Sequence, residues 1–105
     1  MVKSDLYVVK FSASWCGPCK QMEPYWQTRR VQQELKNYKK FTTVDIDRYK
    51  KWSEEFCKVN SIPTILIIDN NYNVYKRHVG YTSDIMSVLK NPFSRSDHQP
   101  IERLK

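Results

Sequence analysis

The segment LYVVKFSASWCGPCK, residues 6–20, decides the fold of this 105-residue chain. Its first six residues are apolar except for Lys10 and are rich in β-branched and aromatic types, which predicts a strand over residues 6–11. A helical pattern begins directly after Cys16, so Cys16 and Cys19 lie where the strand gives way to a helix. Residues three apart in a first helical turn lie on one side of the helix, and the two sulfur atoms can therefore approach bonding distance.

The position of this Cys-x-x-Cys motif gives its two thiols different chemistry. Free N–H groups and the positive end of the helix dipole stabilise an anion at a helix N-terminus. Cys16, nearest that end, is therefore expected to become the thiolate, while Cys19 lies one turn deeper and keeps its proton longer. A disulfide between them closes a very small ring that can open and re-form. Spacing and context together predict a redox-active dithiol.

Two other interpretations of the motif stay open at this point. A Cys-x-x-Cys pair is also half of a zinc site, which needs two more ligands, and the other candidates are Cys57, His78 and His98. These three residues form no second paired motif, which disfavours zinc. Two buried cysteines without chemical function are the remaining interpretation, and the strand–turn–helix context disfavours that as well.

The rest of the chain predicts an α/β fold. Asn70 and Asn71 suit a tight turn, so the last two strands are expected to form an antiparallel hairpin. The order βαβαββα predicts a mixed four-stranded sheet flanked by helices, with its first two strands parallel. The elements expected after the first strand are a helix over 17–38 interrupted and kinked at Pro24, a strand over 41–47, a helix over 49–59, strands over 64–69 and 74–79, and a helix from Thr82 or Ser83 to Lys90.

Length and composition limit the domain organisation and exclude several classes of protein. A chain of 105 residues is expected to hold one domain, here residues 1–92, followed by a polar tail over 93–105. An apolar fraction of 40%, with 13% aromatic residues, excludes an intrinsically disordered chain. No apolar run approaches the roughly 18 residues of a membrane span. The N-terminus resembles no secretory signal, so a reducing cytoplasm is the expected compartment.

The charge of the chain favours an acidic partner. Basic residues number 18 and acidic residues 11, which gives a net charge of +7. The basic residues fall in pairs scattered over several predicted elements, such as Arg29-Arg30 and Lys50-Lys51, and no phosphate-binding loop or RNA-binding aromatic motif accompanies them. We therefore expect acidic protein surfaces as partners, rather than nucleic acid or a membrane.

Several motifs resemble those of the thioredoxin family. The run WCGPCK at 15–20 matches the family's signature in full, and Pro24 matches the proline within its active-site helix. Further matches follow in the same order and spacing at VDID (44–47), IPT (62–64) and VG (79–80). The resemblance spans residues 6 to about 90 and implies a thioredoxin-like fold that lacks the family's usual first strand and helix.

The resemblance implies a protein-disulfide reductase that acts in electron transport and cell redox homeostasis. Cys16 would attack a target disulfide, and Cys19 would resolve the mixed disulfide. No metal or bound cofactor is implied beyond the Cys16–Cys19 disulfide; disulfide-containing proteins and an electron-donating reductase are the implied partners. The other implied site residues are Trp15, Gly17 and Pro18 as active-site support, and Ile62, Pro63, Thr64 and Gly80 as the substrate groove, with a cis bond before Pro63.

Lys10 is the main departure from the family's pattern. The family usually has a buried aspartate six residues before its first cysteine, which assists deprotonation of the second, and a basic neighbour that aligns here with Thr43. The family's acid–base pair is therefore predicted to be absent. Three roles stay open for Lys10: a desolvated neutral amine that acts as a base, a charged group that stabilises thiolate and makes the couple more oxidising, or a side chain that reaches solvent and affects little.

The missing first strand and helix have a consequence for the sheet and for function. The strand over 41–47 should form an exposed edge, which the tail over 94–105 or a partner would cover. Two functions therefore compete with the reductase. One is a more oxidising disulfide oxidase or isomerase of the same fold, which Lys10 favours and the Gly-Pro pair between the cysteines disfavours. The other is a thioredoxin-like binding subunit of a larger assembly, which the exposed edge and the charge favour.

The remaining notable residues are expected to serve structure. Cys57 is expected to be a small buried residue, with a regulatory or dimerising thiol as the alternative. His78 and His98 are expected at the surface. A stripe at helical spacing predicts core packing for Tyr49, Trp52, Phe56 and Val59.

Overall fold

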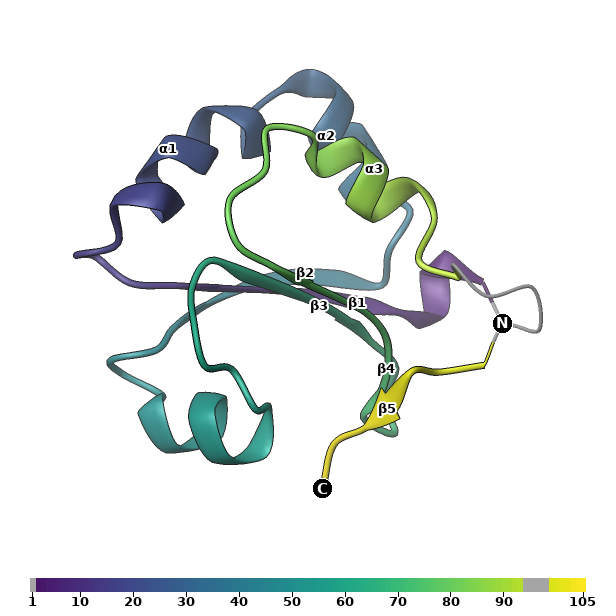
Figure 1. Cartoon of the computed structure of the whole chain (residues 1–105). Helices are drawn as coiled ribbons and strands as arrows, with labels where there is room; N and C mark the ends of the chain where they lie inside the picture. The colour runs from purple at the N-terminus through teal and green to yellow at the C-terminus, as the bar shows by residue number, and fades with distance from the viewer. Residues whose placement is uncertain (1, 94–98) are drawn as a thin grey trace.

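A five-stranded mixed sheet forms the centre of the computed structural model, which describes residues 2–93 and 99–105 (Figure 1). In order across the sheet, the strands are β2 (Lys40–Asp45), β1 (Tyr7–Ser12), β3 (Thr64–Ile68), β4 (Asn73–Val79) and β5 (Glu102–Arg103). β1 and β2 run parallel because a helical crossover joins them, and the other neighbours are antiparallel. The predicted α/β class, the parallel first pair and the hairpin are confirmed; β5 was not predicted.

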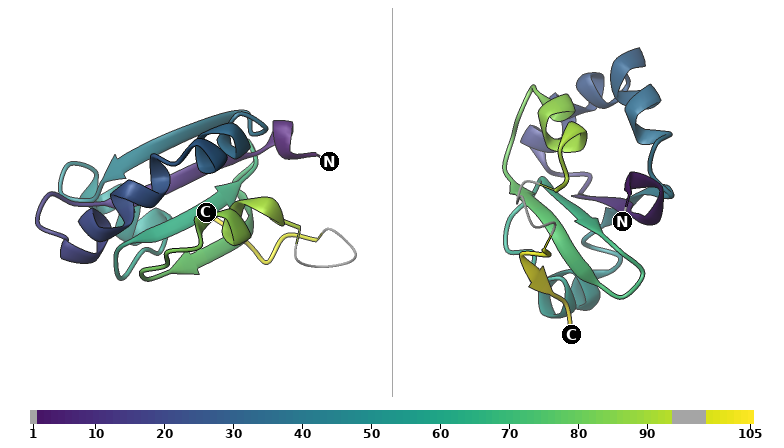
Figure 2. Two further views of the ribbon diagram at one scale, coloured as in Figure 1. Left: turned by 90° about the horizontal axis from the view of Figure 1, so that it is seen from above. Right: turned by 90° about the vertical axis from the view of Figure 1, so that its right-hand side faces the viewer.

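The two faces of the sheet are covered unequally (Figures 1 and 2). Three helices lie on one side, which we call the helical face: α1 (Gly17–Trp26), α2 (Arg29–Leu35) and α3 (Ile85–Lys90). The opposite side, the η2 face, carries the short helical turn η2 (Trp52–Phe56). A single turn, η1 (Lys3–Asp5), precedes β1. Within the described ranges, no helix is long and apolar enough to cross a membrane.

The single helix predicted over 17–38 is in fact two helices. The predicted interruption at Pro24 is wrong, because α1 continues through it to Trp26. The break comes at Thr28, whose side-chain oxygen accepts a hydrogen bond from the N–H of Val31 (3.4 Å) and so caps α2. A threonine cap satisfies a backbone group that the helix end leaves without a partner. Pro24 removes only one N–H donor from α1, and the helix continues past it. The capping hydrogen bond of Thr28, in contrast, starts a new helix.

The helix predicted over 49–59 is shorter in the structure than predicted, because the regular turn η2 spans only Trp52–Phe56. η2 ends in a hydrogen bond from the N–H of Cys57 to the C=O of Trp52 (2.9 Å), and this wider i→i+5 spacing stops the helix. The stripe is therefore not uniformly buried as predicted. Val59 lies in the core, but half of Tyr49 is exposed.

The last helix also begins later than predicted. Asp84, rather than Thr82 or Ser83, caps α3, because its carboxylate accepts the N–H of Ser87 (3.2 Å). The Thr82 hydroxyl instead accepts the N–H of Asp84 (3.0 Å), which shapes the approach to the helix. Threonine, serine and aspartate are all common N-cap residues, so the sequence alone does not show which of the three consecutive positions caps α3.

Two apolar cores fill the space on either side of the sheet. On the helical face, Trp26 stacks on Phe41 with ring centroids 5.1 Å apart, and this core holds α1 against β1 and β2. On the η2 face, Phe11 and Leu66 are fully buried and pack with residues from the C-terminal end of the chain. The first core is what positions the two cysteines, since α1 carries Cys19 above the sheet.

The C-terminal residues form part of the folded structure. Leu104 is 4% exposed and completes the core of the η2 face, while Arg77 of β4 pairs with Glu102 of β5 (2.6 Å). The prediction of a loose polar tail is therefore wrong for residues 101–104. The alternative in which the tail covers the edge at β2 is also wrong for residues 101–104, because β5 lies at the opposite edge, beside β4. The part of the predicted tail at 94–98 lies outside the described residues.

Candidate active site

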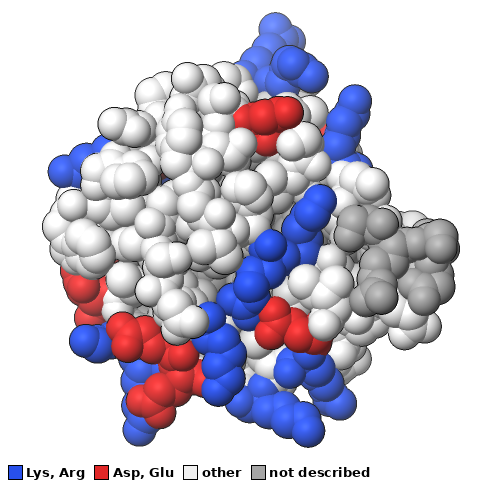
Figure 3. Space-filling view, viewed as in Figure 1, with Lys and Arg blue, Asp and Glu red and all other residues white. Residues whose placement is uncertain are grey.

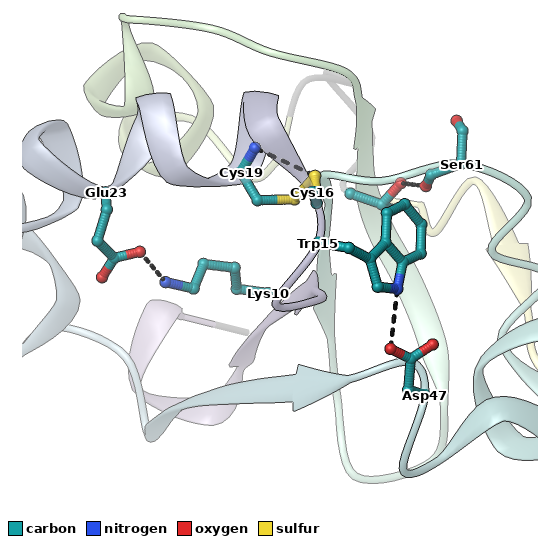
Figure 4. Close-up of a disulfide and its surroundings, with 8 residues drawn as sticks. Lys10, Trp15, Cys16, Cys19, Glu23, Asp47 and Ser61 are labelled. Atoms are coloured by element: carbon teal, nitrogen blue, oxygen red, sulfur yellow. Dashed lines mark hydrogen bonds and ion pairs between the residues drawn. A yellow bond between two sulfur atoms is a disulfide. The ribbon is translucent and has the colours of Figure 1, made fainter.

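Cys16 and Cys19 form a disulfide at the junction of β1 and α1 (Figure 4). A short turn follows β1, and the N–H of Cys16 donates to the C=O of Ala13 (3.2 Å). Cys16 is then the N-cap of α1, and Pro18 stands in the first turn, where its missing N–H costs no helical hydrogen bond. The Cα atoms of the two cysteines are 5.3 Å apart, and both residues are nearly buried.

The helix end acts directly on the sulfur of Cys16. The N–H of Cys19 donates a hydrogen bond to the Cys16 Sγ atom (3.1 Å). The first turn of α1 contains no acidic side chain to oppose the positive end of the helix dipole. When the disulfide is reduced, this arrangement stabilises negative charge on Cys16 in preference to Cys19.

A loop on the other side of the sulfur atoms completes the apolar floor of the site. The Ile62–Pro63 bond is cis, as predicted, and the N–H of Gly80 donates to the C=O of Pro63 (2.8 Å). Gly80 has φ of 99°, a conformation that only glycine adopts readily. Ile62 packs against the cluster formed by Ala13, Cys16 and Cys19. Thr64 is fully buried in β3, one residue beyond this floor.

Trp15 is the exposed wall of the site. It is 63% exposed, and its indole N–H donates to the Asp47 carboxylate (2.8 Å). Sequence reasoning missed Asp47, although a signal existed: β1 and β2 are parallel, so the residues after both strands meet at one edge of the sheet. Beside Trp15 lies a groove of about 440 Å³, lined further by Ile46, Glu54, Val59, Asn60, Ser61 and Ile62.

Lys10 lies beneath α1 and is paired with an acid. Its side chain is 9% exposed, and its Nζ atom donates to Glu23 Oε2 at 3.0 Å (Figure 4). The family's acid–base pair is absent, as predicted, because the strand neighbour of Lys10 is Thr43; Lys10 instead pairs with a half-exposed glutamate of α1, a contact that was not predicted. The alternative in which Lys10 reaches solvent is wrong, because the side chain is enclosed.

Glu23 was not predicted, although it follows Cys19 by four residues and so lies on the same side of α1. Half of its side chain is exposed. Burial alone would raise the pKa of Glu23, but the hydrogen bond and positive charge of Lys10 outweigh burial and lower the pKa. The pair is therefore a carboxylate with an ammonium, which favours the charged state among the roles left open for Lys10.

The other candidate residues lie away from this centre. Cys57 is 1% exposed, and burial raises the pKa of its thiol to about 12, which fits the predicted packing role. His78 is partly buried, and its Nε2 atom is fully buried, so the prediction of a surface histidine is wrong for that atom. His98 lies outside the described residues. Among residues 2–93 and 99–105, no three His, Cys, Asp or Glu side chains are grouped to hold a metal ion.

Comparison with known proteins supports the same assignment. The sequence profile of the Thioredoxin family matches residues 1–91. The thioredoxin of Mycoplasmoides gallisepticum is 37% identical over 85 residues, covering 79% of this chain and 80% of that protein. Protein disulfide isomerase-like 2-3 of Oryza sativa is 40% identical over 63 residues, which are 60% of this chain but only 14% of that protein.

Solved structures show the same fold. Thioredoxin from Fasciola hepatica superposes with a TM-score of 0.70 at 26% identity, covering 85% of this chain and 82% of that one. A thioredoxin from Nicotiana alata gives 0.67 at 31% identity, covering 83% and 73%. Fold and disulfide together define a thiol–disulfide oxidoreductase with a Cys-x-x-Cys centre. This chain belongs to the thioredoxin family.

Proposed function

We propose that this protein reduces disulfide bonds of other proteins, with Cys16 as the nucleophile and Cys19 as the resolving thiol. The observation that carries the proposal is the position of Cys16 Sγ at the N-terminus of α1, where it accepts the N–H of Cys19. A thiolate held there is reactive at neutral pH, whereas Cys19 is set one turn deeper.

The reaction proceeds by two exchanges of sulfur. The Cys16 thiolate attacks one sulfur of the substrate disulfide; a mixed disulfide forms, and the other substrate sulfur leaves as a thiolate. Cys19 then loses its proton to solvent and attacks Cys16 Sγ, which forms the Cys16–Cys19 disulfide and releases the second substrate thiolate. Two electrons pass from the protein to the substrate, and the two leaving thiolates take up protons from water.

The exposed rim around the disulfide is the proposed substrate groove. Trp15 and Ile62 flank the sulfur atoms, and Gly80 closes the loop beside them. A Cβ atom at Gly17 would meet no atom within 4 Å, so this side of the turn is open to an approaching chain. The backbone of Ile62, before the cis bond, would pair with an extended substrate segment.

The partners are proposed from chemistry and charge. An external reductase must return the Cys16–Cys19 disulfide to the dithiol, because the proposed reaction consumes two electrons. Figure 3 shows Lys and Arg side chains along the rim and in the lower part of this face, beside Asp and Glu, and the net charge of +7 favours acidic protein surfaces in general. We place the activity in a reducing cytoplasm, in electron transport and redox homeostasis, with no resident metal or cofactor.

The proposal is tested by trapping the mixed disulfide. With dithiothreitol as the electron donor, Cys16→Ser is expected to reduce a disulfide-bonded substrate protein at the uncatalysed rate. In a separate incubation without dithiothreitol, pre-reduced Cys19→Ser is expected to accumulate a covalent adduct with the substrate through Cys16, visible by mass spectrometry. Cys57→Ser is the control and should retain activity. Full activity of Cys16→Ser would overturn the proposal, and so would a reduction potential above that of the glutathione pool, which would indicate an oxidase.

A further inference from the structure

We propose that Lys10 and Glu23 act as a positioning pair that sets the redox equilibrium of the disulfide: the Lys10 ammonium stabilises the thiolate of the reduced centre, and Glu23 limits that effect. The inference rests on the proposed exchange reaction and assigns these two residues no contact with substrate.

The location of Lys10 places its charge under the active-site helix. β1 lies between β2 and β3, and Lys10 stands in its middle, on the helical face. Its Cα neighbours across the sheet are Thr43 and Ile65, both uncharged, and the row continues to His78 on β4. Figure 4 shows the side chain running beneath α1 from below Cys19 to Glu23.

Three contacts surround the Nζ atom of Lys10. The carboxylate of Glu23 accepts a hydrogen bond from Nζ at 3.0 Å. The same nitrogen lies 5.1 Å from the ring centroid of Trp26 and 5.8 Å from that of Phe41. An aromatic face attracts a cation and offers nothing to a neutral amine. Together, one carboxylate and two aromatic faces give the Lys10 ammonium favourable partners where little water reaches it.

The two charges of the pair do not cancel at Cys19. Lys10 is enclosed, with a side chain 9% exposed, whereas half of the Glu23 side chain is in water. Water screens a charge that it reaches far more than one that it does not. Cys19 is itself only 6% exposed, so little water lies around its sulfur atom to screen the charge of Lys10. We therefore expect a net positive potential at the sulfur atoms of the reduced centre.

A positive potential shifts the balance between the two redox states. The disulfide carries no charge, whereas the reduced form carries a thiolate, so Lys10 favours the reduced form. The same field lowers the cost of removing the Cys19 proton before the second exchange. Removing the lysine should therefore favour the disulfide, and removing the glutamate should favour the dithiol.

The experiment measures the equilibrium with glutathione buffers at pH 7, counting free thiols by mass spectrometry. Lys10→Met should shift the equilibrium toward the disulfide by about tenfold, or about 30 mV. Glu23→Gln should shift it about threefold toward the dithiol, less because Glu23 is screened. Lys3→Met is the matched control, since it breaks the Lys3–Glu34 ion pair (2.8 Å) away from the disulfide, and should stay within about twofold of the wild-type value.

The outcomes separate this inference from the proposed function. Opposite shifts of Lys10→Met and Glu23→Gln support the pair, because a purely structural role would not produce opposite signs. Shifts of the same sign, or shifts no larger than that of Lys3→Met, overturn it while leaving the exchange reaction intact. A wild-type protein that does not equilibrate with glutathione at all counts against the proposed function instead. If Lys10→Met does not fold, Lys10→Arg replaces it: a wild-type equilibrium supports the charge role, and a tenfold shift overturns it.

Discussion

Lys10 and Asp69 are both charged and both buried, at 7% and 3% exposure, but the protein holds them in different ways. Asp69 accepts hydrogen bonds from the N–H groups of Asn71 and Asn73, from the Asn73 side chain and from the Tyr75 hydroxyl. Lys10 donates one hydrogen bond within the described ranges, to Glu23, which is 13 residues away.

We interpret this difference as that between a charge that stabilises the fold, Asp69, and a charge that acts on the disulfide, the role proposed for Lys10. The hydrogen-bond partners of Asp69 all lie within the next six residues, so this carboxylate stabilises the turn of the hairpin between β3 and β4. A charge with several local partners stabilises the turn that supplies them. Lys10 has fewer partners and lies under the redox centre, where an apolar residue would pack as well. A charged residue at a position that suits an apolar one is a pattern expected at functional sites.

The largest expected effect is the loss of the Asp69 carboxylate. Asp69→Ala leaves the donors of Asn71, Asn73 and Tyr75 without an acceptor in a buried turn. We expect a decrease in the free energy of unfolding of about 3 kcal/mol, measured by urea denaturation. Asp84→Ala, which removes the exposed cap of α3, is the control and should cost only about 1 kcal/mol. Equal losses in the two variants would contradict the role given to Asp69.

Acid should remove part of the same stabilisation. Burial by itself would raise the pKa of Asp69, but the hydrogen bonds from Asn73, Asn71 and Tyr75 outweigh it and lower the pKa. The unfolded chain therefore binds this proton at a higher pH than the folded chain does. The stabilisation is complete above the unfolded value near 4 and is lost as the pH falls through the lower folded value.

The matching measurement compares the wild-type protein with Asp69→Asn by urea denaturation between pH 7 and pH 3. The wild type should be more stable at pH 7, and the gap should narrow as the pH falls below about 4, because Asp69 then becomes neutral. The pKa of Glu34 is also lowered, chiefly by its hydrogen bond with Lys3, but this contributes equally to both proteins. If the difference in free energy of unfolding between the two proteins stays constant with pH, then Asp69 stabilises the turn through its shape and not through its charge.

The sequence alone predicted the features that depend on residues close together in the chain. Alternating and helical apolar patterns located four strands, and Cys16 and Cys19 were placed correctly at the start of α1. Glu23 was missed because its partner comes from a different element. β5 was missed because Ile101 and Leu104, the two aliphatic residues in a polar stretch, do not alternate as strand residues do, and the core that receives Leu104 is built from distant segments.

The smallest expected effect on stability comes from Lys10→Met, and it is the sharpest test of the comparison. Removing one member of a buried ion pair normally costs several kcal/mol, because the other charge remains buried. Here the remaining charge is on Glu23, whose side chain is already half in water, and methionine fills the space between Trp26 and Phe41. We therefore expect the free energy of unfolding to change by less than about 1 kcal/mol, measured by urea denaturation of the oxidised protein.

Lys3→Met again serves as the control, since it removes an equal charge from a pair in which Glu34 is largely buried. Lys3→Met should lose more stability than Lys10→Met, because the Glu34 carboxylate left without its partner is less exposed to water than that of Glu23. A loss of about 3 kcal/mol in Lys10→Met would place Lys10 with Asp69, as a charge that the fold itself requires. A small loss, together with a changed redox equilibrium, would mean that the lysine is kept at this position for its effect on the disulfide.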